Sequence, residues 1–280
     1  MPELPEVETV ARDLRPLVRG RRVEEVEVRM PGIVRYPDPE TFAALLRGRR
    51  FGELARRGKY LLLPLDSGEM AGPSPLLVCH LGMTGQLRLV PPGTPEPDHL
   101  HVVLHLDGAD ELRYRDPRRF GRLLLGTPDD LIAARAMPLL GPEPIAEDFT
   151  GALLWHRLHH RRAPVKALLL EQTVVAGVGN IYADEALFRA RIRPLRPANT
   201  LSRPAVRRLA AALREVLLGA IQNRGSSVID YRDVFGEAGS NQERLLVYGR
   251  AGEPCVRCGR PLHLTRIAQR SAVWCAWCQR

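Results

Sequence analysis

Hydrophobic and polar positions change their spacing along the chain, and the changes predict its elements. In residues 1–16 apolar side chains such as Leu4 and Val7 recur at helical spacing, which predicts a helix. From about residue 23 to residue 125 short apolar runs alternate with turns rich in glycine and proline. This pattern is typical of a β-sandwich or barrel. One segment inside it, 41–48, has the pattern of a short helix.

The second half of the chain has a different pattern. Helical spacing returns after a stretch rich in proline and glycine, and a loop rich in glycine, serine and aspartate follows it. The fold class is therefore α+β: an N-terminal β-sandwich with flanking helices, a C-terminal helical domain and a hairpin module. We expect a sandwich domain at 1–140, a linker at 141–151, a helical domain at 152–244 with its loop at about 223–240, and the module at 245–280.

Four of the five cysteines lie in the last segment of the chain. Cys255 and Cys258 form one Cys-x-x-Cys pair, and Cys275 and Cys278 form another, at a spacing typical of a zinc ribbon. Two such pairs supply four thiolates to a tetrahedral Zn²⁺ and leave no open position, so the metal is expected to be structural. A redox dithiol pair and an iron centre are the alternatives. Cys79 stands alone in an apolar run and is expected in the core.

The charge of the chain indicates a polyanionic partner. Lys and Arg total 41 and Asp and Glu 32, which gives a net charge of +9 and a pI near 9.9. Nucleic acid is the most frequent partner of such a chain. Only Lys59 and Lys166 are lysines. A GC-rich genome explains the excess of arginine, and a retained lysine then indicates a position that needs a compact amine.

Neither secretion nor membrane insertion is expected. The acidic N-terminus lacks the basic and apolar regions of a signal peptide. No apolar run approaches the ~18 residues that a membrane span needs.

The N-terminus carries candidate chemistry. Removal of Met1 would expose Pro2 as a secondary amine, and an α-amine titrates near ~7.7–8.0, so part of it is unprotonated at neutral pH. Such an amine attacks an aldehyde-like carbon and gives an iminium, which is an electron sink. Glu3 is adjacent and Glu6 lies one turn further on, so either carboxylate could transfer protons. Read alone, the segment is more often an acidic helix start.

A second candidate site precedes a predicted helix in the helical domain. The segment 177–180 reads Gly-Val-Gly-Asn, and free N–H groups at a helix start bind anions such as phosphate. Asn180 is a good N-cap residue. A Gly-x-Gly segment alone is more often a tight turn.

Several segments together resemble one family, the formamidopyrimidine-DNA glycosylases, in family order along nearly the whole chain. The segments are MPELPEVETV, RRGKYLL, HLGMTG, RDPRRFG, GVGNIYADEALF and the terminal CxxC…AQR…CxxC. The resemblance implies a two-layered β-sandwich with flanking helices, a helix-two-turn-helix region and a zinc finger.

The resemblance also implies a bifunctional DNA repair enzyme. Such an enzyme flips an oxidised purine, 8-oxoguanine or a formamidopyrimidine, out of duplex DNA and cleaves its glycosidic bond. It then nicks the abasic site by β,δ-elimination through a Schiff base on the N-terminal proline. One structural Zn²⁺ and no organic cofactor are implied, in a monomer of the bacterial cytoplasm that associates with the nucleoid through DNA.

Catalytic roles follow from the matching motif positions. Pro2 matches the nucleophile that attacks C1′ of the sugar, and Glu3 matches the proton donor that opens the sugar ring. Lys59 matches the lysine of β-elimination, which also meets phosphate. Arg270 matches the finger arginine linked to phosphate binding and δ-elimination.

Further positions match DNA contacts of the family. A trio of apolar and basic side chains would fill the gap left by the flipped base. The trio is Met83, Arg118 and Phe120, and the remaining contacts are His99, Arg161, Lys166 and Asn180. At Arg161 the family often has lysine, and the lesion-recognising loop at 225–240 is not assigned residue by residue.

Two alternatives differ from this interpretation in substrate or in class. An endonuclease VIII-like glycosylase would remove oxidised pyrimidines, but that group tends to have glycine where Leu4 stands and lacks the trio. The other alternative is a DNA-binding zinc protein without catalysis, in which Pro2 and Glu3 have no chemical role.

Overall fold

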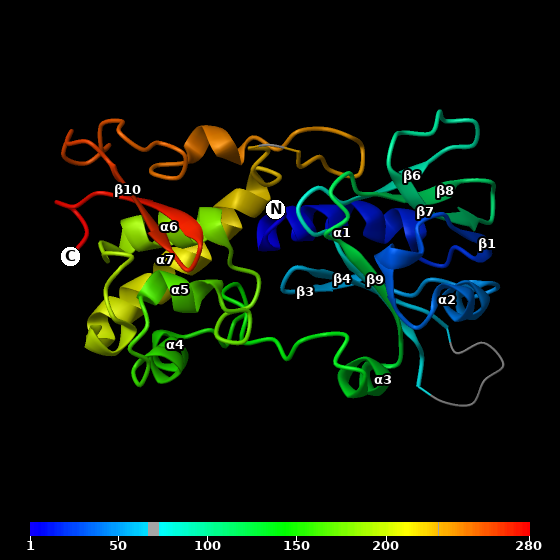
Figure 1. The fold of residues 1–280 in the computed structure, drawn as a ribbon, viewed down its shortest axis with the longest axis horizontal. Helices are drawn as coiled ribbons and strands as arrows, with labels where there is room; N and C mark the ends of the chain where they lie inside the picture. The colour runs from blue at the N-terminus through cyan, green and yellow to red at the C-terminus, as the bar shows by residue number, and fades with distance from the viewer. Residues whose placement is uncertain (67–72, 229) are drawn as a thin grey trace. The chain divides into compact units, whose positions relative to one another are not determined.

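The computed structural model describes residues 1–66, 73–228 and 230–280. The chain forms two compact units (Figure 1). The first contains Met1–Pro138 together with Arg224–Gly239, and the second contains Leu139–Asn223 together with Ser240–Arg280. The loop of residues 224–239 therefore packs with the β-rich unit, whereas its sequence position had placed it in the helical domain.

Two β-sheets form the body of the first unit. The antiparallel sheet has the order β1-β7-β8-β6, with strands β1 (Val23–Val28), β6 (Gln86–Val90), β7 (Leu100–Leu106) and β8 (Glu111–Arg115). The other has the order β2-β9-β5-β4-β3, with strands β2 (Val34–Tyr36), β3 (Ala55–Arg57), β4 (Tyr60–Pro64), β5 (Leu76–His80) and β9 (Arg122–Gly126). Only the β2–β9 pair in this sheet is parallel.

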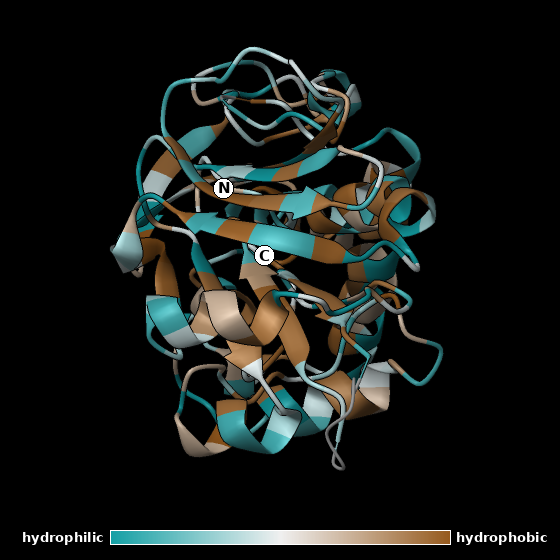
Figure 2. Cartoon of the chain, turned by 90° about the vertical axis from the view of Figure 1, so that its right-hand side faces the viewer, coloured by the Kyte–Doolittle hydropathy of each residue, from teal (hydrophilic) through white to brown (hydrophobic). Residues whose placement is uncertain are grey.

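Side chains from both sheets and from helix α1 (Leu4–Val18) share one core. Leu61, Leu104 and Leu112 in the strands are fully or almost fully buried. Hydrophobic and hydrophilic positions mix along the strands, as the brown and teal segments of Figure 2 show. Several strands, such as β5 and β9, are buried at consecutive positions, and their side chains meet those of the other sheet in the shared core. The predicted β-sandwich is therefore confirmed. Cys79 also lies in this core, where burial raises the pKa of its thiol.

Helix α1 packs an apolar face into this core. Val7, Ala11, Leu14 and Val18 are fully buried along its length. These residues recur every three or four positions, which is the spacing that brings them to one face. The other helices of the first unit are α2 (Pro39–Leu46), which Asp38 caps, and α3 (Pro128–Ala133), which Thr127 caps.

The second unit is built from four helices. They are α4 (Gly151–Leu158), α5 (Val165–Leu170), α6 (Asn180–Ala190) and α7 (Arg203–Gln222). Helix α7 packs against both α4 and α6, and Ser202 caps its start through the N–H of Ala205. None of the helices in the described part of the chain has the length and apolarity that a bilayer crossing requires.

A hairpin and the C-terminus complete the second unit. Strands β10 (His263–Ile267) and β11 (Arg270–Trp274) pair in an antiparallel ribbon, and β11 packs against α6. Short 3₁₀ turns connect other segments at Pro31–Ile33, Ala198–Thr200 and Asn241–Arg244.

Candidate catalytic site and nucleic-acid interface

The start of helix α1 fixes the N-terminal chemistry in place. Glu3 is the N-cap residue, and its N–H donates to the Glu6 carboxylate at 2.7 Å in a capping box. Only 2% of Glu3 is exposed, and Pro2 is also buried. A capping box satisfies N–H groups that a helix start otherwise leaves unpaired. Pro2 and Glu3 therefore stand at a rigid helix start.

Glu6 has a structural part in this site. Its carboxylate accepts hydrogen bonds from the N–H groups of Glu3 and Ser226, each at 2.7 Å, and 1% of the residue is exposed. Gly225 has a φ of +80°, and a Cβ on it would lie 2.9 Å from the Glu6 side chain. Oε2 thus belongs to the capping box of α1, and Oε1 holds Ser226 of the loop to the helix. Because both oxygens are engaged in structural bonds, the arrangement disfavours the proton-transfer role considered for Glu6.

Lys59 occupies the turn between β3 and β4, and both strands pack against α1. It is 5% exposed, and the preceding Gly58 has a φ of +59°. The salt bridge from Arg56 to Glu8, at 2.7 Å, ties this strand pair to the helix. Burial, with the charges of Arg122 and Lys59, lowers the pKa of His80 to about 4. The turn therefore holds Lys59 beside α1 and near His80.

The predicted trio stands on two neighbouring loops. Met83 lies in the loop between β5 and β6, and Arg118 and Phe120 lie in the loop between β8 and β9. The Arg118 guanidinium lies over the Phe120 ring at 5.1 Å, and 57% of Phe120 is exposed. An exposed phenylalanine carrying an arginine is suited to insertion between bases.

A buried carboxylate, Asp116, joins these two loops. One of its oxygens accepts from the Thr84 hydroxyl at 2.5 Å, and the other accepts from the Gly121 N–H at 2.8 Å. The same Thr84 hydroxyl accepts from the N–H of Arg118 at 3.1 Å. Asp116 is fully buried. Sequence analysis missed it, although it stands inside the RDPRRFG segment.

His99 belongs to the same arrangement. Its carbonyl accepts from the Asp116 N–H at 3.1 Å, and its φ of +62° is unusual for a residue other than glycine. The side chain is exposed. The backbone thus presents the imidazole outward from the loop that Asp116 anchors.

Lys166 is enclosed in the second unit. Its ammonium pairs with the Asp184 carboxylate at 2.7 Å, and both side chains are fully buried. It also donates to the carbonyl of Ser271, and the second Asp184 oxygen accepts from the Val273 N–H at 3.1 Å. Burial raises the pKa of Asp184 to about 6, against the opposing charge of Lys166. Lys166 therefore links α5 and α6 to strand β11, whereas the resemblance implied a phosphate contact.

A helix begins at the end of the GVGN segment, as predicted, but the N-cap residue is Gly179 and not Asn180. Asn180 is the first helical residue. The Asn180 amide donates to the Ser271 hydroxyl at 3.2 Å, and its buried carbonyl oxygen has no hydrogen-bond partner among the described residues. The Gln172 side chain, which sequence analysis missed, shapes this turn by bonding Gly177 and Val178 at 2.8 and 2.9 Å.

Arg161 and Arg270 are both exposed. Arg161 pairs with Glu171 at 2.9 Å, with about half of each side chain in solvent. Arg270 begins β11 after a two-residue turn in which Ala268 and Gln269 have φ values of +47° and +61°. Such a turn usually contains glycine or asparagine, so its backbone is strained. The turn and the pairing of Ile267 with Arg270 place Arg270 at the end of the ribbon.

The four cysteines of the predicted metal site converge. Their sulfur atoms lie within 4.8 Å of one another, with Cys255–Cys278 at 4.0 Å and Cys258–Cys275 at 3.5 Å. A tetrahedral ion with Zn–S bonds of ~2.3 Å requires sulfur separations of about 3.8 Å. The donor set and its dimensions therefore fit one Zn²⁺.

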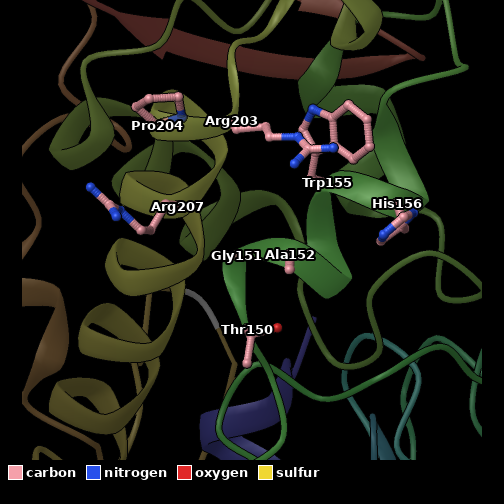
Figure 3. A pocket seen from close by; sticks show the side chains of 8 residues that line it. All are labelled: Thr150, Gly151, Ala152, Trp155, His156, Arg203, Pro204 and Arg207. Carbon is pink, nitrogen blue, oxygen red and sulfur yellow. The ribbon is translucent and has the colours of Figure 1, made fainter.

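A pocket of about 380 Å³ between α4 and α7 lies apart from these residues (Figure 3). Trp155 forms one wall, stacked on His159 at 3.8 Å with the Arg203 guanidinium at 4.4 Å. None of the candidate catalytic or DNA-binding residues lines it.

Three family models cover most of the chain. The formamidopyrimidine-DNA glycosylase N-terminal domain matches residues 1–123, and the H2TH domain of the same family matches residues 140–231. A zinc finger found in FPG and IleRS matches residues 252–280. The last match, with the sulfur geometry, supports zinc over the redox and iron alternatives.

Curated relatives match over the full chain. The formamidopyrimidine-DNA glycosylase of Symbiobacterium thermophilum is 49% identical over all of this chain and 89% of its own length. That of Syntrophotalea carbinolica is 47% identical over the whole of both chains.

Solved structures agree with these matches. The MutM (Fpg) protein of Thermus thermophilus has a TM-score of 0.87 and 46% identity, over 99% of this chain and 98% of its own. Lactococcus lactis Fpg in complex with DNA containing an abasic site has a TM-score of 0.90 and 36% identity, over 99% of each chain. From the motifs at its N-terminus to its cysteine-rich end, the chain belongs to the formamidopyrimidine-DNA glycosylase family.

Proposed function

We propose that this protein removes oxidised purines, 8-oxoguanine and formamidopyrimidines, from duplex DNA and nicks the resulting abasic site. The observation that carries the proposal is the pair of Pro2 and Glu3 at the fixed start of α1, in a chain that matches the family from end to end. Complexes of Lactococcus lactis Fpg with Fapy-dG DNA and with abasic-site DNA support this choice of substrate.

The first step uses the terminal amine. Once Met1 is removed, the lone pair of the Pro2 nitrogen attacks C1′, and the C1′–N bond breaks as the base leaves. The departing base takes up the proton that the Pro2 nitrogen gives up. Glu3 donates a proton to the ring oxygen, the ring C1′–O bond breaks, and an iminium forms between Pro2 and C1′. Burial of Glu3 at the N-cap of α1 keeps its carboxyl group next to Pro2 in the chain and out of bulk solvent.

The iminium then permits strand cleavage. Loss of a proton from C2′ supplies the electron pair that expels the 3′ phosphate, and a second elimination expels the 5′ phosphate. Lys59 assists the first elimination and contacts phosphate. Arg270, at the end of the β-ribbon, holds the phosphate of the second.

The trio acts on the DNA that surrounds the flipped nucleotide. Met83 and Phe120 fill the vacated space, and the Arg118 guanidinium reads the edge of the orphaned base. Asp116 keeps their two loops in register. His99, Arg161 and Asn180 contact the backbone, whereas Lys166 positions the strand that carries Ser271.

Zinc and cellular setting complete the proposal. Cys255, Cys258, Cys275 and Cys278 would hold one Zn²⁺, which organises the finger and takes no part in the reaction. The protein acts as a monomer in the bacterial cytoplasm, without a membrane partner. The domain limits proposed from sequence, 1–140, 152–244 and 245–280, describe its modules, with residues 224–239 serving the first.

Trapping with borohydride tests the function. The protein is mixed with a duplex carrying one 8-oxoguanine opposite cytosine, and borohydride reduces any iminium to a stable amine. We expect a covalent adduct with this duplex and none with its undamaged counterpart. An adduct formed only with a thymine glycol duplex would favour the endonuclease VIII-like alternative. Binding without any adduct would favour the non-catalytic one.

A further inference from the structure

A large cavity at the zinc-knuckle end of the second unit is lined by arginine. Its volume is about 740 Å³, and it lies among the end of α6, the start of α7 and the last cysteines. No acidic side chain of the described residues lines it. Its five arginines are Arg191, Arg196, Arg208, Arg257 and Arg280.

These guanidiniums have no carboxylate partner in the described part of the chain. Arg257 donates to the Phe188 carbonyl at 2.7 Å and lies over the Phe188 ring, and Arg196 donates to the Thr200 carbonyl at 2.9 Å. These two are therefore held in place by the backbone. The other three are exposed, and their guanidiniums make no hydrogen bond or ion pair with any described residue. Crowded like charges raise the free energy of the fold unless an anion compensates them.

The metal site does not account for all of this charge. Four thiolates around Zn²⁺ carry two net negative charges, and the C-terminal carboxylate adds a third. Five guanidiniums leave an excess of two positive charges. The cavity therefore retains a positive potential when zinc is bound.

The chemistry of the cavity favours phosphate esters. Guanidinium groups bind phosphate oxygens in bidentate fashion, and arginine is the preferred residue for such contacts. Trp277 at the wall is 56% exposed and carries the Arg260 guanidinium at 3.6 Å. The volume exceeds what one phosphate needs, so several linked phosphates fit the site better than a single ion.

The cavity lies away from the phosphate contacts assigned to the lesion strand. Asn180 and Arg270 lie near Ser271, at the turn end of the β-ribbon. Cys258 and Cys278 lie beyond its other end, and a five-residue strand spans about 17 Å. The cavity and the residues beside Ser271 therefore lie too far apart to contact the same phosphate.

We propose that this arginine cavity binds the phosphate backbone of a second DNA segment while the lesion site holds the first. The inference rests on the proposed action on DNA and extends it. A protein that contacts two segments passes directly from one to the other, which shortens its search for damage.

Dissociation kinetics test this proposal. The zinc-loaded full-length protein is bound to a fluorescent duplex containing a tetrahydrofuran abasic analogue, and unlabelled undamaged duplex is added at increasing concentration. Direct transfer makes the dissociation rate rise with competitor concentration. In Arg191→Gln/Arg208→Gln/Arg280→Gln we expect this rise to disappear, with unchanged nicking of a short 8-oxoguanine duplex. In the parental protein, the competitor-dependent part of the dissociation rate should fall with salt concentration as expected for roughly three phosphate contacts, one for each of the three arginines.

A variant with the same change in net charge serves as control. Arg203, Arg207 and Arg244 are exposed in the same unit and lie outside the cavity. Their triple change to Gln should leave the competitor effect intact.

Three results would overturn the proposal. One is a parental dissociation rate that is independent of competitor, and another is an equal loss of the effect in the control variant. The third is acceleration by inorganic tripolyphosphate but not by duplex, which would assign the cavity to a small phosphate ester. Failure of the proposed function itself is distinguishable, because it would abolish borohydride trapping and leave dissociation measurable.

Discussion

Two buried carboxylates position the reactive and DNA-binding residues of the first unit. Glu6 bonds the Glu3 N–H and the Ser226 N–H, and Asp116 bonds Thr84 and Gly121. A carboxylate accepts several hydrogen bonds at once, and a bond to a charged acceptor in a dry site contributes about 1.5–3 kcal/mol. These residues act through others and are positioning residues.

Asp116→Asn should loosen the trio without touching DNA itself. The asparagine amide has one accepting oxygen where the carboxylate has two. Either the Thr84 hydroxyl or the Gly121 N–H therefore loses its acceptor, at a cost of about 1–3 kcal/mol in the free energy of unfolding. Chemical denaturation measures that cost, and nicking of one lesion opposite each of four bases measures discrimination. Asp98→Asn, at an exposed position of the same unit, is the control. Parental discrimination in Asp116→Asn would argue against the positioning role.

Arg118→Ala and Lys59→Ala should separate base recognition from chemistry. Loss of an edge contact removes ~1–3 kcal/mol of discrimination between opposite bases. Phosphate and sugar contacts carry no base identity, so Lys59→Ala should slow turnover and keep the ranking. The measurement is the cleavage rate of each variant on one lesion placed opposite each of the four bases. An unchanged ranking in Arg118→Ala contradicts the assignment of the trio.

At the scale of elements, the second unit fastens its β-ribbon to its helices. Lys166 on α5 and Asp184 on α6 form a buried pair, and both bond the backbone of β11. Asn180 adds a bond to the Ser271 side chain. The residue next to Arg270 is thus held by two helices, which fixes where the ribbon presents its arginine.

Lys166→Met should weaken the attachment of the β-ribbon to α5 and α6. It leaves the buried Asp184 carboxylate without its cationic partner, which costs about 3–5 kcal/mol in the free energy of unfolding, whereas Lys166→Met/Asp184→Leu should cost less. Because the ammonium is fully buried, the double variant should keep the parental salt slope of DNA binding. A slope lower by about 0.9 would instead indicate a direct phosphate contact by Lys166.

Removal of zinc should affect the finger more than the sandwich. Chelation, or Cys278→Ser, releases the knuckles that organise the ribbon, so Arg270 loses its position. We expect DNA affinity to fall by about 1.5–3 kcal/mol, the size of one charged hydrogen bond. Hydrogen exchange of β5 should stay near parental protection. Cys79→Ala, which touches no ligand, should retain one zinc per chain. Full cleavage by protein shown to be zinc-free would refute this account.

At the scale of the molecule, periodicity and motif order predicted most of the architecture. The two sheets, the long helices and the cysteine cluster follow from local spacing. The packing of residues 224–239 with the first unit could not be predicted from local spacing, because Ser226 bonds Glu6 across more than two hundred positions in sequence. Lys166 shows the same limit: the family resemblance implied a phosphate contact, but its partner Asp184 lies on another helix. Asp116 was missed because a hydrogen-bond hub has no periodic signal.

The central claim is that the Pro2 amine forms the bond to the sugar, and mapping the trapped adduct tests it most directly. The borohydride-reduced complex is digested and its DNA-bearing peptide is sequenced by mass spectrometry. The chain has only two lysines, Lys59 and Lys166, so every amine that could react lies on a different peptide or at the terminus. We predict that the adduct lies on Pro2 of an N-terminal peptide that lacks Met1. An adduct on Lys59, or on an N-terminal peptide that retains Met1, would contradict the account.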